Sequence, residues 1–453
     1  MKLTRDDLIV GSSILGFFVI SIASMIACGH AFPAMHFWRS DDITAQAVLG
    51  TAVMVAFVPA FVAGRFGFGY VVAFSLLSAV FGFVWLSYFS GFDYPHAIAR
   101  WAMIAGLAAV IIPLLFQDIP VWRPELSEAA LQRIVVALLA MSLAVLIADM
   151  SYGASLGDPY GAARNSVTRP ALLNYLTGII IGALLPYLFA HFATRRQWTS
   201  AVGLLLFAFC FYPVVNNKTI LLLPLWLPFL FWLFGRFDPR LATVLALLVP
   251  MTIGLAAFFV LLPDRSYVVF SAINLRFIAI PSLALDHYAD FFARRGLTHF
   301  CQVSVLRALF GCSYGELGPT LAAVYRDGNF NASFLATEGI ASVGLAFAPV
   351  AAFVCGLVLS VGAIASRHLS PRFVAVSSGI AVQAVVNVPL TTGLLSNGIA
   401  LLFLLWWLTP EWRPELSRSP EPVARPVNAV SLAPSWSSQT AAQPSSGRTQ
   451  IGA

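Results

Sequence analysis

The chain has 453 residues, of which 59% are hydrophobic and only 10% are charged, and its formal net charge is +6. A soluble protein of this length needs far more charge to cover its surface, so the composition excludes a soluble globular domain. The positive charge does not indicate nucleic-acid binding, because basic residues in a membrane protein mainly set its orientation.

Apolar stretches follow one another along almost the whole chain, each close to the roughly 20 residues that a helix needs to cross a bilayer. The stretches are continuous rather than alternating, which excludes a transmembrane β-barrel. We therefore predict an all-α integral membrane protein with about twelve transmembrane helices. The predicted spans are 8–28, 44–64, 69–89, 97–116, 130–149, 171–192, 199–215, 219–235, 240–262, 339–365, 373–390 and 393–409.

Basic residues fix the predicted orientation of these spans. With the N-terminus in the cytoplasm, most basic loop residues also fall on the cytoplasmic side, as the positive-inside rule requires. These residues are Lys2, Arg5, Arg65, Arg123, Arg195, Arg196, Arg236, Arg240, Arg367 and Arg372. Both termini are then cytoplasmic, and the first apolar run is an uncleaved span rather than a signal peptide.

Composition divides the chain into four parts. Residues 1–262 are predicted to form an N-terminal transmembrane bundle of about nine spans, and residues 339–409 the C-terminal transmembrane helices. Between them, residues 263–338 form a large outward-facing segment with short helices. Residues 410–453 are rich in proline, serine and alanine, which predicts a disordered cytoplasmic tail.

The 263–338 segment carries most of the polar side chains. Its basic and titratable residues are Arg265, Arg276, Arg294, Arg295, Arg307, Arg326, His287 and His299, interspersed with Asp and Glu. The positive-inside rule depletes arginine on the outer side, so an outward set of arginines indicates an anionic ligand, and guanidinium groups suit phosphate. For any single arginine, solvation or pairing with an acidic neighbour is the plainer alternative. An outward location also permits a Cys301–Cys312 disulfide, with two free thiols as the alternative.

Four residues are candidates for individual roles in polar chemistry at the outer side. Lys218 lies in a tight turn between two spans, where it either snorkels or offers a point charge to a phosphate. Glu338 opens a helix, where the dipole favours a carboxylate, although in a cavity it could act as a general base. His287 and His299 are alternative bases because histidine titrates near neutrality. The sequence does not rank these three bases.

No phosphate-binding glycine loop, metal-ligand spacing or nucleophile elbow occurs in the sequence, so no cofactor and no metal are predicted. Three short stretches, however, carry a family resemblance. They are Arg276-Phe-Ile-Ala-Ile-Pro281 continuing to Tyr288-Ala-Asp-Phe-Phe292, Asn329-Phe-Asn331 leading to Glu338-Gly339 and Gly344, and Asn217-Lys218-Thr219. With the many-span layout and the late outward segment, they resemble bacterial O-antigen and exopolysaccharide repeat-unit polymerases, the Wzy-like family. The resemblance covers roughly residues 160–350.

This resemblance implies a GT-C-like membrane glycosyltransferase of the bacterial inner membrane that acts on undecaprenyl-pyrophosphate-linked oligosaccharides at the periplasmic face. The growing chain would pass from its lipid carrier to a new lipid-linked repeat unit. Arg276 would bind the pyrophosphate leaving group, assisted by Arg164, Arg294, Arg295 and Lys218, and arginines can offset such charge without a metal. A flippase and a chain-length regulator are the implied protein partners.

Two other functions fit the same pattern. A flippase or transporter of the lipid-linked oligosaccharide would also have many spans, but it would be expected to carry ionisable groups along a pathway within them. An O-antigen ligase would use the same donor and pass the polymer to another acceptor. The sequence leaves both alternatives open.

Overall fold

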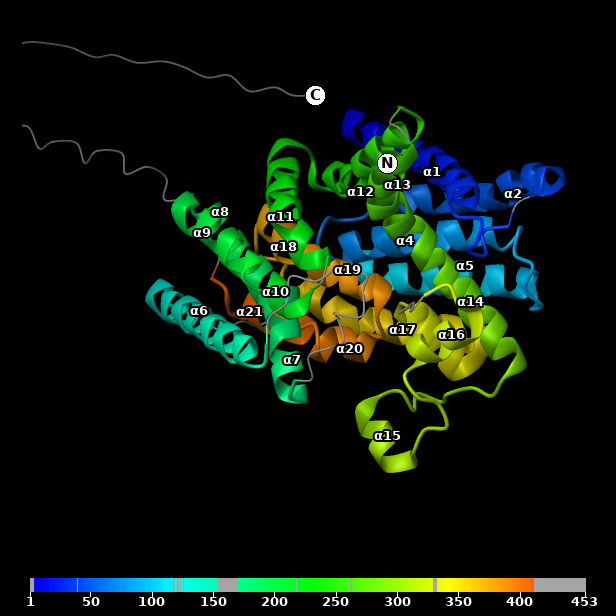
Figure 1. Cartoon of the computed structure of the whole chain (residues 1–453). Helices are drawn as coiled ribbons and strands as arrows, with labels where there is room; N and C mark the ends of the chain where they lie inside the picture. Colours follow the sequence, from blue (N-terminus) through cyan, green and yellow to red (C-terminus); the bar gives the residue numbers. More distant parts are fainter. Residues whose placement is uncertain are drawn as a thin grey trace, which may run out of the picture. The chain divides into compact units, whose positions relative to one another are not determined.

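The computed structural model describes residues 4–38, 40–116, 119, 122, 124, 126–153, 169–216, 218–260, 263–328 and 332–410, with the backbone alone for 218, 263–266, 304 and 305. Every regular element in these residues is a helix (Figure 1). They belong to one compact unit. The predicted tail, apart from Pro410, lies outside the described residues.

The helices fall into three groups along the chain. The first group is α1 (Arg5–Ala31), η1 (Asp41–Ile43), α2 (Thr44–Thr51), η2 (Ala52–Phe57), α3 (Val58–Ala63), α4 (Phe68–Leu86), α5 (His96–Leu115) and α6 (Glu128–Ser151). The second is α7 (Ala171–Ile179), η4 (Ile180–Leu184), α8 (Leu185–Thr194), α9 (Trp198–Phe209), α10 (Tyr212–Val215), α11 (Lys218–Arg236) and α12 (Pro239–Val260). The third is α13 (Pro263–Phe270), η5 (Ser271–Ala279), α14 (Ile280–Arg294), α15 (Ser304–Phe310), α16 (Leu317–Tyr325), η6 (Leu335–Ala341), α17 (Ser342–Ala365), α18 (Pro371–Ser377), α19 (Gly379–Asn387), α20 (Leu390–Leu395) and α21 (Ile399–Leu408).

Eleven helices of the described chain are long and apolar enough to cross a membrane, which confirms the all-α membrane class. The first nine coincide with the first nine predicted spans, because each is a continuous apolar run bounded by polar or helix-breaking residues. The predicted spans differ from these candidates in two places. The segment Tyr267–Arg294 is an additional candidate, whereas the last two predicted spans are broken into short helices.

Contacts between helix ends define the two ends of the bundle. At one end, Arg240 Nη1 at the start of α12 lies 3.0 Å from Asp7 Oδ1 at the start of α1. Arg195, after α8, pairs there with Glu128 at the start of α6. We call this the basic end. The opposite end, where α1 finishes at Ala31 and α4 at Leu86, is called the histidine end.

The continuous helix formed by α13, η5 and α14 does not carry the chain from one end to the other. Tyr267 and Phe270 pack on Phe32, just beyond the last residue of α1. In the C-terminal part of the same helix, Asp286 accepts a hydrogen bond from Ser90, which lies just beyond the end of α4. Both ends of the helix therefore lie at the histidine end, and Figure 1 shows it running obliquely across α4 and α5. The predicted segment of short helices thus contains one long helix, followed by the short α15 and α16.

A glycine turns the chain back on itself between η6 and α17. Gly344 has φ +76° and ψ 170°, a conformation that is essentially restricted to glycine. Leu335, at the start of η6, and Ala352, in α17, both lie against Gly106 of α5. The two segments are therefore side by side, and η6 is a short buried helix that folds back along the first turns of α17.

Helix-breaking residues also divide the chain after α17. Ser378 separates α18 from α19, and Val388 adopts an extended conformation before Pro389, as expected for a residue that precedes proline. Gly398, at φ +73°, begins α21. Neither predicted span, 373–390 or 393–409, is therefore one continuous helix.

A disulfide joins Cys301 and Cys312, whose Cα atoms are 5.1 Å apart, so the structure adopts the bonded alternative. Disulfides persist in oxidising compartments. We therefore expect a thiol reagent to label neither cysteine in unreduced, denatured protein and both after reduction, as measured by peptide mass spectrometry. Cys210, an exposed free thiol, is the internal control for labelling. Labelling of Cys301 and Cys312 without reduction would contradict the bridge.

Candidate functional site

Two histidines and an aspartate meet at the histidine end of the bundle. His36 lies in the loop after α1, His287 on α14, and Asp327 just after α16. One nitrogen of each imidazole and one oxygen of the Asp327 carboxylate all lie within 4.8 Å of one another. His287 Nε2 is 3.1 Å from Asp327 Oδ2, and His36 Nδ1 contacts the same oxygen. We call these three residues the His–His–Asp cluster.

Aromatic rings hold both imidazoles in place. His287 stacks on Tyr325 with a centroid distance of 4.2 Å and an interplanar angle of 4°. His36 packs edge-on against Trp38 at 4.8 Å and contacts Phe92 at 5.0 Å. Because these contacts come from three segments of the chain, the cluster depends on the packing of the whole histidine end.

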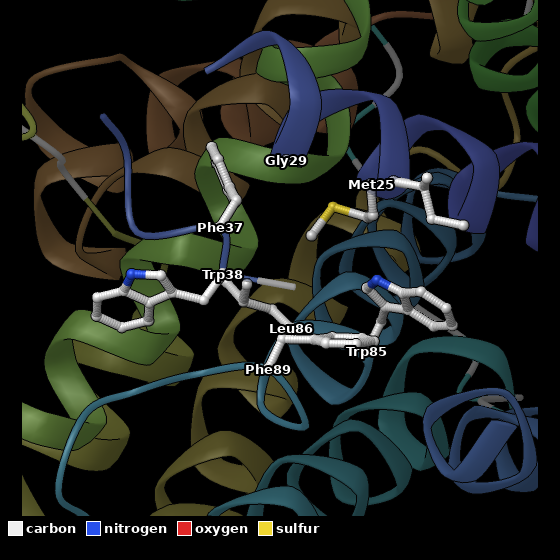
Figure 2. Close-up of a pocket in the computed structure, with 8 residues that line it drawn as sticks. Met25, Gly29, Phe37, Trp38, Trp85, Leu86 and Phe89 are labelled. Atoms are coloured by element: carbon white, nitrogen blue, oxygen red, sulfur yellow. The ribbon is translucent and has the colours of Figure 1, made fainter. Parts of the chain in front are cut away.

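Trp38 also lines an apolar pocket next to the loop after α1, the loop that carries His36 (Figure 2). The pocket is lined by Met25, Ile26, Gly29, Phe37, Trp38, Trp85, Leu86 and Phe89, from the last turns of α1, the following loop and the end of α4. This apolar packing anchors the loop that carries His36. Its only polar side-chain groups are the indole N–H groups of Trp38 and Trp85, and it contains no titratable side chain.

Two further acids on α14 tie the neighbouring loops to that helix. Asp290 accepts a hydrogen bond from the Tyr325 hydroxyl at 2.6 Å and forms an ion pair with Arg294. Asp286, one turn earlier, accepts hydrogen bonds from Ser90 at 2.9 Å and from Tyr94. Both carboxylates are buried and already paired, so we assign them a positioning role.

The electrostatics of the site favour an anionic Asp327 and a neutral Tyr325. Burial raises the pKa of Asp327, but hydrogen bonds from His287 and His36 outweigh it, so the net pKa lies below its usual value. Burial, together with the hydrogen bond to Asp290, raises the pKa of Tyr325. Asp327 is thus a carboxylate at neutral pH and Tyr325 a neutral donor.

Of the three side chains in the cluster, that of His36 is the most exposed. The side chains of His287 and Asp327 are 1% and 5% exposed, whereas that of His36 is 25% exposed. A ligand therefore approaches past His36, while His287 and Asp327 form the closed floor.

Glu338, one of the three predicted bases, is buried away from this opening. Its Oε1 accepts the backbone N–H of Leu390 at 2.9 Å, and its Oε2 accepts the Thr337 hydroxyl. The carboxylate therefore caps the N-terminus of α20 and ties that helix to η6. No described contact joins Glu338 to the His–His–Asp cluster.

The other two predicted bases, His299 and His287, differ in their surroundings. His299 is exposed in a turn at φ +47°, with no described partner, whereas His287 is the only predicted base that contacts Asp327. His36 and Asp327 were not predicted as site residues. The available signal was that both lie on the predicted outer side, but hydropathy gave no reason to pair two residues 291 positions apart.

The predicted pyrophosphate ligands fall into three classes. Arg294 pairs with Asp290, and Arg295 lies over the Phe291 ring at 4.4 Å. Arg164 lies outside the described residues, as does the side chain of Lys218, so their predicted roles stay predictions. Arg276 is exposed on η5 and has no ion-pair partner among the described residues.

Arg276 lies below the end of the bundle rather than in a surface loop. Two residues earlier, Asn274 Nδ2 donates to Met251 O and to Ser24 Oγ, each at 2.8 Å, and both partners are inside candidate spans. The next residue, Phe277, packs on Trp226 of α11 at 5.9 Å. Arg276 is therefore an exposed arginine whose neighbours in the helix pack on residues inside candidate spans.

No protein-family model, curated protein or solved structure matches the chain.

Proposed function

We propose that the chain is a membrane glycosyltransferase that polymerises undecaprenyl-pyrophosphate-linked oligosaccharide repeat units at the outer face of the bacterial inner membrane. The observation that carries the proposal is Arg276, an exposed arginine beside candidate spans without an acidic partner among the described residues. A cation in that position is costly unless it faces water or binds an anion. The pyrophosphate of a lipid carrier is such an anion, and the hydrocarbon tail of the carrier keeps it at the bilayer.

An apolar groove beside the histidine end supports a lipid-linked substrate. The groove, a cavity of about 410 Å³, lies between α5 and α17. It is lined by Ala97, Ile98, Trp101, Ala102, Ala105, Leu345, Ala346 and Pro349. Ile98 and Trp101 are 58% and 62% exposed, so the groove opens to the bilayer and suits a polyprenyl tail.

The His–His–Asp cluster supports a role in activating the acceptor. A glycosyl acceptor must lose a hydroxyl proton as the new bond forms, and an imidazole oriented by a carboxylate is a suitable proton acceptor. Both His287 and His36 are paired in this way with Asp327, and His36 is the one whose side chain an acceptor can reach. Glu338, already engaged as a helix cap, is the weaker candidate for the base.

A transporter of the same lipid-linked oligosaccharide is the second candidate function. Interrupted helices within the membrane often form substrate sites in transporters. Here, η6 folds back at Gly344, and Glu338 caps the N-terminus of the short α20. This arrangement favours transport more than the sequence alone did.

Deleting the gene in its bacterial host tests the proposal directly. We expect the surface-polysaccharide ladder to disappear while single repeat units are retained, because those units would be made and exported but not joined. The measurement is a gel of surface polysaccharide combined with analysis of lipid-linked intermediates, and a plasmid-borne copy of the gene is the control.

Each alternative predicts a different pattern in that experiment. Single lipid-linked units confined to the cytoplasmic leaflet would indicate transport instead. Lipid-linked polymer that accumulates without transfer to its final acceptor would indicate a ligase. An unchanged ladder would contradict all three functions.

A further inference from the structure

We propose that His36, His287 and Asp327 bind a divalent transition-metal ion, for which Zn²⁺ is the best match. Two imidazole nitrogens and one carboxylate oxygen are a ligand set that suits zinc, whereas Mg²⁺ prefers oxygen ligands alone. All three donors already converge within 4.8 Å. No metal-ligand spacing is visible in the sequence because the three ligands come from distant segments of the chain.

The distances in the cluster are close to those of a metal site. Zinc binds nitrogen and oxygen at about 2.0–2.2 Å, so ligand atoms around a tetrahedral ion lie roughly 3.3 Å apart. His287 Nε2 and Asp327 Oδ2 are 3.1 Å apart, and the widest separation among the three donor atoms is within 4.8 Å. Changes of at most about 1.5 Å in these separations would therefore suffice to enclose an ion.

The surroundings of the cluster supply the orientation that metal ligands need. Outer contacts fix the rings of ligating histidines, and here Tyr325 stacks on His287 while Trp38 and Phe92 pack against His36. Asp327 gives the cluster one negative charge, and Asp290 adds a second nearby that Arg294 offsets. The site is therefore anionic towards an incoming cation.

Three protein ligands leave a coordination position for a substrate or water, as in catalytic rather than structural zinc sites. That position faces the exposed side of His36, the open side of the cluster. A zinc-bound hydroxyl group has a lowered pKa, so with the metal bound the ion, rather than a ligating imidazole, would assist the deprotonation of an acceptor sugar. This chemical role rests on the proposed function, but the binding of the metal does not.

The test uses the full-length protein, purified in detergent and stripped with a chelator. Zn²⁺ is then titrated in, and bound metal is measured by mass spectrometry after desalting. We expect about one zinc per chain, no comparable uptake of Mg²⁺, and a visible absorption spectrum of a four- or five-coordinate ion when Co²⁺ replaces zinc.

Two histidine variants provide the matched comparison. His36→Ala removes a ligand from a half-exposed loop position and should weaken zinc binding at least about 100-fold, because even changes to outer-shell partners cost 10–100-fold. His299→Ala removes an exposed histidine of the same predicted side and should leave zinc binding unchanged. Absence of saturable zinc binding in the wild-type protein, or equal binding by His36→Ala, would overturn the metal site.

A polymerisation assay with the stripped and zinc-loaded protein separates the two proposals. Zinc-dependent polymer formation supports both the metal site and its chemical role. Zinc binding with polymer formation that chelation does not affect supports the site and overturns the acceptor role. Zinc binding by a protein that forms no polymer under any condition supports the site and contradicts the proposed function.

Discussion

Replacing Arg276 with alanine is expected to abolish polymer formation while the protein still inserts and folds. The side chain is exposed and has no described ion-pair partner, so its removal leaves no buried group unpaired. If it stabilises the departing pyrophosphate, its loss should lower the rate about 10²–10³-fold, as for other groups that offset developing negative charge. The measurement is polymer formed from lipid-linked repeat units by purified protein.

Two further variants sharpen the interpretation of this result. Arg276→Lys keeps the charge but loses the planar fork that binds phosphate oxygens, so it should retain part of the activity. Arg307→Ala removes an exposed arginine of α15 whose Nη2 donates a long, exposed hydrogen bond to the Tyr314 carbonyl at 3.4 Å, and it should behave like the wild type. Normal polymer formation by correctly folded Arg276→Ala would contradict the pyrophosphate role.

Substituting Glu338 distinguishes a helix cap from a catalytic base. Alanine leaves the buried N–H of Leu390 without its acceptor, which should lower the free energy of unfolding by about 1–3 kcal/mol. Glutamine keeps an oxygen acceptor for that N–H, and its amide can donate to Thr337, so the loss should be much smaller. Thermal unfolding in detergent measures both effects.

The activity of the same two variants completes the test. If Glu338 acts only as a cap, Glu338→Gln should remain active at temperatures where it is folded, and Glu338→Ala should lose activity in proportion to its lost stability. A folded, inactive Glu338→Gln would show instead that the carboxylate is needed for chemistry, and would restore it as the candidate base.

Hydropathy predicted the first nine candidate spans because it measures how long a run of residues is soluble in a bilayer, and each of those runs is uninterrupted. Hydropathy did not predict the direction in which a helix runs relative to the bundle. The continuous helix of α13, η5 and α14 is apolar enough to be taken for a span. Its sequence does not show that its first turns pack near Phe32 and its later turns near Ser90, both at the histidine end. Gly344 presented a similar difficulty, because a glycine in an apolar run is compatible with both a continuous helix and a reversal.

The candidate site was predictable only in part for the same reason. His287 and Arg276 stood out as polar residues in an otherwise apolar chain, and the structure leaves both available for function, one beside Asp327 and one exposed. Glu338 stood out equally, yet its carboxylate is occupied by Leu390, which lies in a different helix. Polarity in a sequence shows that a side chain needs a partner, but it does not say which partner.

The sequence by itself determined the membrane class, most of the spans and the concentration of arginine and histidine in the 263–338 segment, because these follow from local composition. Only the tertiary structure decided that His36, His287 and Asp327 meet, that Glu338 caps a helix, and that Arg276 is exposed beside candidate spans without an acidic partner among the described residues. Those outcomes depend on contacts between segments that are far apart in the chain. Such contacts are set by how the helices pack and turn, which composition and hydropathy do not encode.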